Sequence, residues 1–336
     1  MQVPRSGVAV PRDPRLDEQP SWLHEAQSHV AASPSESSSG GRALVIAALL
    51  SLYVIWGSTY YAMRVALETL PPYMMGALRF SIAGAVLFVV LRARGAEWPR
   101  PRQWLAAGAV GTLLLVLGNG LVVLAERSVD TGTAATVVST MPLWMAAIGW
   151  FWGERPKARE LVGLSFGFAG IVVLNGGGGI SLHGVDGLAV LLSPVAWALG
   201  SLWSRRLPMP KGLMSSACQM LLAGPLMFLV AFARGEQLHG PLSSESAAAL
   251  AYLIVFGSLI AFSAYGFVLR TTRPLIASSY AYVNPLVALG IGAAFAGEHL
   301  TTRKLGACAL TVIGVLVVTL SRTNAAIAPV AAARAR

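Results

Sequence analysis

Charged side chains are scarce in this sequence of 336 residues. Only 12% of the residues are Asp, Glu, Lys or Arg, whereas 55% are hydrophobic and the mean hydropathy is +0.64. Soluble domains carry about 25% charged residues, so this composition leaves too little polar surface to cover a water-soluble globule. The apolar runs show no alternation of period two, which excludes an outer-membrane barrel. The composition therefore predicts an all-α integral membrane protein.

Cysteine is almost absent, and groups that could do chemistry inside the apolar runs are few. Cys218 and Cys308 both lie in apolar runs, which excludes a disulfide framework and a metal cluster. None of the five histidines lies in such a run. The segment 163–167 fits both G-x-x-x-G and G-x-S-x-G, and without a base we interpret it as a helix-packing face. We expect no enzyme and no cofactor.

Ten apolar segments predict ten transmembrane helices, because a bilayer core needs about 20 apolar residues per helix. Residues 1–42 are rich in Pro, Ser and charge, so we expect a disordered tail there and a short tail at 322–336. The predicted spans are 43–63, 73–91, 104–125, 130–152, 161–175, 187–203, 213–233, 247–269, 274–296 and 305–321.

The net charge of +10 is distributed unevenly between the two faces of these spans. If the N-terminus is cytoplasmic, 19 Lys and Arg residues lie on the cytoplasmic side and 5 on the opposite side. Cytoplasmic loops of membrane proteins carry an excess of Lys and Arg. The charge therefore orients both termini toward the cytoplasm. It indicates a lipid bilayer and no nucleic acid as partner.

The chain also contains an internal repeat. Trp56 and Trp197 are 141 positions apart, while Glu154 and Glu298, each preceded by Gly, are 144 apart. Each half holds five spans, in the ranges 43–175 and 187–321. Because five is odd, the second half must enter the membrane from the opposite side. Inverted repeats of this kind are typical of secondary transporters.

Several short motifs carry a family resemblance. They are Tyr53–Tyr60, Leu70-Pro71-Pro72, Ala77–Phe80, Gly118-Asn119-Gly120, Ala196–Ser201 and Ser279–Pro285. Together they resemble the EamA-domain proteins of the drug/metabolite transporter superfamily, and within them the YedA-like exporters. The resemblance implies a ten-helix carrier with two inverted five-helix EamA repeats. It also implies a bacterial cytoplasmic (inner) membrane location and an exporter.

Arg79 is the only formal charge inside a predicted span, about 9 Å from the outer end of its helix. A charge at membrane depth is costly and usually faces the bundle interior. One interpretation is a counter-ion for a carboxylate or phosphate of the substrate. The alternative is a permanent structural partner, for which Glu126 and Asp130 are candidates.

Two prolines fall near the middle of predicted helices at related positions. Pro142 and Pro285 each remove one backbone donor and free the carbonyl four residues back, at Val138 and Ala281. Such carbonyls need partners in lipid. We expect helix kinks with a gating role beside a central cavity, with simple bending for packing as the alternative.

Aromatic and amide side chains surround these positions in the sequence. A cavity lined by rings with a few polar groups suits a small amphiphilic molecule. Tyr280 also belongs to this group, but it is two residues from Tyr282, so both cannot face one cavity. With Arg79, the predicted substrate-binding residues are Trp56, Tyr60, Asn119, Trp197, Tyr265, Tyr282 and Asn284.

The predicted function is export of a small amphiphilic, zwitterionic or anionic metabolite or drug by a monomer or homodimer. Glu126, Glu154 and Glu298 lie at helix ends, where we expect ion pairs or a role in coupling. None of the carboxylates lies clearly inside a span, which disfavours exchange of cations for protons. A channel or facilitator and a cation-drug/proton antiporter remain the alternatives.

Overall fold

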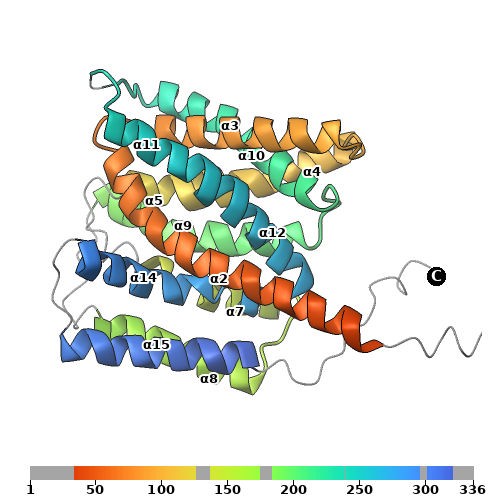
Figure 1. Ribbon diagram of the computed structural model, residues 1–336, viewed down its shortest axis with the longest axis vertical. Coiled ribbons are helices and arrows are strands. Elements are labelled where there is room, and N and C mark those ends of the chain that lie inside the picture. Colours follow the sequence, from red (N-terminus) through yellow and green to blue (C-terminus); the bar gives the residue numbers. More distant parts are fainter. Residues whose placement is uncertain (1–33, 126–136, 175–183, 239, 296–300, 321–336) are drawn as a thin grey trace, which may run out of the picture. The chain divides into compact units, whose positions relative to one another are not determined.

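The computed structural model describes residues 34–125, 137–174, 184–238, 240–295 and 301–320. Within these ranges the chain is helical with short connections and contains no strand. It divides into two units, Met1–Leu44 and Val45–Arg336. Most of the predicted N-terminal tail and all of 322–336 lie outside the described residues. The arrangement described below is that of the second unit (Figure 1).

Six helical stretches in the described part of the chain are long and apolar enough to cross a membrane. They coincide with the first, second, third, sixth, seventh and eighth predicted spans, so this is a multi-pass membrane protein. These stretches lie in α2 (Pro34–Ala66), α3 (Pro72–Ala93), α4–η2–α5 (Pro101–Ala125), α9 (Gly184–Ser204), α10 (Leu213–Ala233) and α11–η3–α12 (Ser244–Thr271).

The remaining predicted spans appear as shorter helices, because two of them are interrupted. A turn at Ser139 and Thr140 precedes α7, and a turn at Ser278 and Ser279 separates α13 from α14. The start of α2 also differs from the prediction. Residues 34–42, predicted as disordered, continue the helix, since extending a helix needs no new nucleus. The shorter helices are α7 (Met141–Phe151), α8 (Ala158–Leu174), α13 (Pro274–Ala277), α14 (Tyr280–Phe295) and α15 (Thr302–Leu320).

Helices α3 and α10 are repeat equivalents that pack against each other (Figure 1). A Cβ atom on Gly84 would lie 2.5 Å from the backbone nitrogen of Leu221, and one on Gly224 would lie 2.6 Å from that of Ser81. Gly84 is separated from Gly224 by the same sequence offset as Ser81 from Leu221, so the two contacts are reciprocal, as in a two-fold interface. Because moving forward along α3 moves the contact back on α10, the equivalent helices are antiparallel.

Helices α8 and α15 form a second pair of repeat equivalents (Figure 1). A Cβ on Gly170 would lie 2.8 Å from the backbone oxygen of Ala307, and one on Gly314 would lie 2.6 Å from that of Gly163. These contacts are again reciprocal and antiparallel, because one offset relates Gly163 to Ala307 and Gly170 to Gly314. The G-x-x-x-G segment is therefore a packing face, and the two repeats are inverted.

Each repeat also contains one π-helical segment in its third helix. The segments are η2 (Thr112–Asn119) and η3 (Leu253–Ile260). The two segments begin 141 positions apart and end 141 positions apart, which is also the separation of Trp56 and Trp197. Wide turns of this kind loosen the backbone ladder and often occur at functional sites. The repeat therefore reproduces a local backbone irregularity as well as the helix order.

Candidate functional site

A cavity of about 70 Å³ lies among helices of both repeats. Its volume has room for a few water molecules, since one water needs about 10–15 Å³ measured in this way. Six of the eight predicted substrate-binding residues line it, and Tyr265 and Tyr282 do not. The six are Trp56, Tyr60, Arg79, Asn119, Trp197 and Asn284.

Arg79 is the cationic residue in the cavity wall, and its side chain is only 3% exposed. Its Nε donates a 2.7 Å hydrogen bond to the hydroxyl of Ser258, 179 positions away. Its Nη2 lies 2.8 Å from where a Cβ on Gly257 would be. Among the described residues Arg79 makes no ion pair, and Glu126 and Asp130 lie outside them.

The two π-helical segments supply the backbone groups around this arginine. The indole nitrogen of Trp56 donates to the carbonyl oxygen of Gly257 in η3 at 3.1 Å. The hydroxyl of Ser193 donates to that of Gly118 in η2 at 2.6 Å. Both glycines line the cavity. Because a side chain at either position would fill this space, glycine lets other helices approach the carbonyls.

Four aromatic rings form a cluster at the inner limit of the cavity. Trp56 and Trp197, which are repeat equivalents, meet edge to face with their ring centroids 5.6 Å apart. Tyr280 packs against Trp56 at 4.6 Å, and Tyr265 packs against both tryptophans. Tyr265 lies behind these rings, with its hydroxyl 2.5 Å from that of Ser201. Tyr265 is therefore not among the residues that line this cavity, and its role in substrate binding stays a prediction.

Tyr282 is also not among the residues that line this cavity, and its role in substrate binding stays a prediction. Its ring lies 2.7 Å from where a Cβ on Gly167 of α8 would be, and its hydroxyl is 3.4 Å from the oxygen of Leu164. Tyr280 lines the cavity instead. Two residues on a helix point in nearly opposite directions, so only one of the pair can face the cavity. The sequence shows that Tyr280 and Tyr282 face different sides of the helix, but it does not show which side faces the cavity.

The two predicted prolines lie in different helical settings, and their gating role stays a prediction. Pro142 is the second residue of α7, directly after the turn that interrupts the chain, and Pro285 lies five residues after the start of α14. The oxygen of Ala281 accepts a 2.9 Å hydrogen bond from Ser139. Val138, whose carbonyl Pro142 would free, lines the cavity. Pro142 therefore lies directly after an interruption, whereas Pro285 lies inside α14, where it removes one backbone donor.

Amide groups add polarity to the cavity wall. Asn119 and Asn284 both line it, and the Oδ1 atom of each is buried without a hydrogen-bond partner. Unsatisfied buried polar atoms are uncommon in folded proteins and call for an explanation. Two such atoms from different repeats, next to a buried guanidinium, are suited to a polar ligand. No cluster of metal ligands is present among the described residues.

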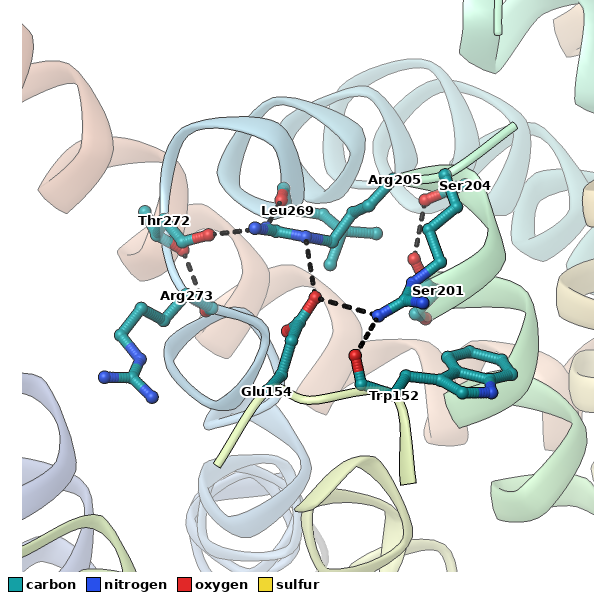
Figure 2. Close-up of polar contacts among 9 residues, drawn as sticks. Trp152, Glu154, Ser201, Ser204, Arg205, Leu269, Thr272 and Arg273 are labelled. Atoms are coloured by element: carbon teal, nitrogen blue, oxygen red, sulfur yellow. Dashed lines mark hydrogen bonds and ion pairs between the residues drawn. The ribbon is translucent and has the colours of Figure 1, made fainter. Parts of the chain in front are cut away.

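A polar cluster closes the end of α9 that lies away from the cavity (Figure 2). The carboxylate of Glu154 lies 4.0 Å from Nε of Arg205 and 3.8 Å from Nη2 of Arg206. Nη1 of Arg205 donates to the backbone oxygens of Leu269 and Thr272 at 2.6 and 2.8 Å. The cluster thus joins the ends of α7, α9 and α12. The other two acidic residues predicted at helix ends, Glu126 and Glu298, lie outside the described residues.

A second ion pair at the same end was not predicted. Glu160, only 1% exposed, lies 3.0 Å from Nε of Arg273 and accepts a hydrogen bond from the backbone of Lys157. Nη2 of Arg273 also donates to the backbone oxygen of Arg155. The sequence gave no complete capping signature here, because Lys157 stands where a capping box has Ser or Thr. The carboxylate of Glu160 thus contacts both the backbone N–H of Lys157 and the side chain of Arg273, which is distant in the sequence.

One face of α9 connects the cavity to this cluster. Ser193 and Trp197 line the cavity, Ser201 bonds Tyr265, and Arg205 bonds the end of α12. These four residues follow each other at intervals of four, so they form one stripe, about 6 Å apart. The stripe runs from the cavity to the polar cluster around Glu154.

Two segments of the chain, residues 43–176 and 187–320, match the family described as EamA-like transporters. The chain belongs to the EamA-like transporter family. It is 40% identical over 276 residues to the uncharacterized inner membrane transporter YedA of Escherichia coli strain K12, covering 82% of this chain and 90% of that relative. It is 26% identical over 279 residues to the uncharacterized transporter YvbV of Bacillus subtilis strain 168, covering 80% and 90%.

A solved crystal structure has the same fold as this EamA protein. It superposes with a TM-score of 0.67 at 23% identity, covering 82% of this chain and 96% of the other. At that identity the likeness shows the fold alone. The predicted family and the predicted all-helical pair of EamA repeats are confirmed.

The two EamA repeats contribute unequal chemistry to the site. At the sequence offset shared by α3 and α10, the counterpart of Arg79 is Gln219. At the offset that relates the two tryptophans of the ring cluster, the counterpart of Tyr60 is Ser201. The backbone is thus nearly symmetric, whereas the cation is present in the first repeat only. At these two positions the first repeat therefore offers a cation and a phenol where the second offers an amide and a hydroxyl.

Proposed function

We propose that this EamA protein is a secondary transporter that moves a small amphiphilic, zwitterionic or anionic metabolite or drug by alternating access. The observation that carries the proposal is Arg79, a buried cation in the wall of a cavity built from both repeats. A guanidinium inside the membrane region is costly unless it has a partner. A carboxylate or other anionic group of the substrate provides that partner.

The difference between the two ends of the bundle supports a carrier. The cavity reaches Tyr60 and Met63 near the end of α2, whereas the other end of α9 is closed by Glu154, Arg205 and Arg206. A carrier exposes its site to one side at a time. An open half and a closed half related by inverted repeats are what such a carrier requires.

The lining of the cavity supports a substrate that is not a simple cation. Among the residues that the structure describes, the lining includes one arginine, several aromatic rings and two amides, and no Asp or Glu. An organic cation would meet the positive charge of Arg79 without a compensating carboxylate. A volume of about 70 Å³ also favours a small molecule in this conformation.

The location and orientation extend the proposal. We infer ten spans in a bacterial cytoplasmic membrane, with both termini in the cytoplasm and transport directed outward. The charge asymmetry of 19 to 5 supports the orientation. The description of the Escherichia coli relative as an inner membrane transporter supports the location. The interrupted helices at Ser139 and Ser278 account for the spans that are short.

The test is a thermal-shift screen of purified protein against amino acids, other metabolites and amphiphilic drugs. A ligand that stabilises the wild type should not stabilise Arg79→Ala, and should still stabilise the exposed-arginine control Arg102→Ala. Proteoliposomes should then show saturable flux of that ligand, reduced in Arg79→Ala. Full flux by an Arg79→Ala protein that inserts normally contradicts the assigned site. Single-channel steps would identify a channel, and proton-coupled export of quaternary ammonium dyes would identify a cation antiporter.

A further inference from the structure

Three buried polar atoms lie in the closed half of the bundle without hydrogen-bond partners. They are the hydroxyl of Ser216, Oε1 of Gln219 and the hydroxyl of Ser263, on side chains that are 1%, 5% and 8% exposed. Inside a membrane protein no bulk water can satisfy such groups. Buried polar atoms that remain unpaired therefore call for a functional explanation.

These atoms come from one interface, between α10 and α12. The hydroxyl of Ser216 lies 2.8 Å from where a Cβ on Gly266 would be. Consecutive membrane spans run in opposite directions, so moving three residues forward on α10 corresponds to moving three residues back on α12. This register places Gln219 level with Ser263. The unpaired groups are thus neighbours along one helix pair.

The internal repeat relates this region to the cavity. Gly84 of α3 and Gly224 of α10 are 140 positions apart, and Trp56 and Trp197 are 141 apart. At one or the other of these two offsets, four cavity-lining residues correspond to four residues of the closed half. These four counterparts are polar, although a permanently packed core would favour apolar side chains there, while other counterparts of the lining, such as Met220 for Phe80 and Leu259 for Gly118, are apolar. The pairs are Tyr60 with Ser201, Met63 with Ser204, Arg79 with Gln219, and Val122 with Ser263.

We propose that Ser201, Ser204, Gln219 and Ser263 line a second cavity, which is closed in this structure and opens toward the Glu154 end. This inference rests on the proposed alternating access and names the second state of the same pathway. When the two EamA repeats exchange their conformations, the inner residues take the exposed places that their counterparts hold here. Water and the polar groups of the substrate then satisfy the unpaired atoms.

The chemistry of the second cavity differs from that of the first. Arg79 offers a charge to an anionic group, whereas Gln219 offers only hydrogen bonds. A substrate reaching the inner cavity therefore keeps hydrogen-bond partners but has no counter-ion from this repeat position. Another cation does border this region, because Nη1 of Arg270 lies 3.2 Å from where a Cβ on Gly266 would be, the same position that lies 2.8 Å from the hydroxyl of Ser216.

The first experiment measures the access of a membrane-impermeant methanethiosulfonate reagent to Ser263→Cys in membrane vesicles of either orientation. Modification is located by peptide mass spectrometry. Native Cys218 is the internal control, because it is next to Gln219 on α10 and is fully buried. We expect Ser263→Cys to react from the Glu154 face at least tenfold faster than Cys218. The substitution Glu154→Gln should raise that rate further.

Reaction of Ser263→Cys at the rate of Cys218, or from the opposite face only, overturns the proposal. If Ser263→Cys does not insert, Ser216→Cys replaces it as the reporter, with the same two outcomes. Flux that still depends on Arg79 in the presence of an unreactive reporter would overturn the inner cavity and leave the proposed function intact. Flux that does not depend on Arg79 would instead contradict the proposed function.

The second experiment uses Gln219→Met, which keeps the length of the side chain and removes both its unpaired Oε1 and the 3.0 Å hydrogen bond that its Nε2 donates to Ser215. Ser215→Ala, which removes the same bond and keeps Oε1, is the matched control. If the unpaired oxygen serves only the hidden state, its removal should stabilise the closed conformation. We expect a higher unfolding temperature together with at least tenfold slower modification of Ser263→Cys. A structural role for Gln219 predicts the opposite change in unfolding temperature. A lower unfolding temperature, or an unchanged rate of modification, overturns the proposal.

Discussion

The hydroxyl of Ser139 donates a 2.9 Å hydrogen bond to the backbone oxygen of Ala281. Pro285 has no N–H and cannot bond that oxygen within its own helix. Ser139 lies in the turn before α7, so one interrupted helix satisfies a carbonyl that proline frees in the other. This bond joins the two EamA repeats beside the cavity.

Replacing this serine tests how much that bond contributes. We expect Ser139→Ala to destabilise the protein by about 1–3 kcal/mol, because the oxygen of Ala281 would be left buried and unpaired. The measurement is the unfolding midpoint of the purified protein in detergent. Ser165→Ala is the matched control, since this exposed hydroxyl bonds only its own helix at Leu161. Equal unfolding midpoints for the two variants would show that the bond between Ser139 and Ala281 contributes no more to stability than a bond within an exposed helix.

The glycines between α8 and α15 provide a second test. A Cβ on Gly314 would lie 2.5 Å from the backbone nitrogen of Gly167, so Gly314→Ala must push the helices apart. We expect a loss of about 1–3 kcal/mol from overpacking, seen as a lower unfolding midpoint.

The control for that test lies on the same helix. A Cβ on Gly306 would meet nothing within 4 Å. Gly306→Ala should therefore leave stability unchanged or raise it by roughly 0.5–1 kcal/mol, because alanine is the better helix former. A stable Gly314→Ala protein would mean that the close approach of the two helices is dispensable.

The hydrogen bond between Ser258 and Arg79 predicts an effect on ligand binding. For a ligand that stabilises the wild type but not Arg79→Ala, we expect Ser258→Ala to weaken binding about tenfold, or about 1.4 kcal/mol. The reason is that the guanidinium loses the acceptor that holds its Nε. Ser258→Thr keeps the hydroxyl and should retain binding. The dissociation constants of the three proteins decide the matter, and equal values for wild type and Ser258→Ala would contradict it.

The two acidic residues at the closed end should differ in their contribution to stability. Glu154 is 33% exposed and lies 3.8–4.0 Å from its arginines, so Glu154→Gln should cost less than about 1 kcal/mol. Glu160 is 1% exposed at 3.0 Å from Arg273, and Glu160→Gln should cost several times more, because a buried arrangement loses its charge. Unfolding midpoints at low and high salt measure both. The reverse order would contradict this assignment.

The inverted repeat predicts opposite compartments for two similar motifs. A phosphatase that is active only outside the cytoplasm, fused after Lys157, should be inactive, and one fused after Lys304 should be active. Fusions of a cytoplasmic reporter at the same positions should give the reverse pattern. The same activity at both positions would rule out opposite orientations for the two repeats.

The lining of the cavity separates what sequence reasoning can reach from what it cannot. Arg79 could be singled out because a lone charge in an apolar run is visible in one dimension. Its partner Ser258 could not, because it is 179 positions away and gave no signal of its own. Tyr282 was preferred over Tyr280 because the alternation along a helix does not say which face meets the cavity.

The sequence by itself determined the membrane class, the family, the repeat offsets and the resemblance of the two halves. These properties follow from hydrophobicity, charge and residue spacing, which are arranged along the chain. Only the tertiary structure decided where the fourth and ninth spans are interrupted and that equivalent helices pack antiparallel on each other. It also decided that Oε1 of Gln219 and the hydroxyl of Ser263 remain unpaired. The physical reason is that these outcomes depend on contacts between helices distant in sequence, which one helix cannot encode alone.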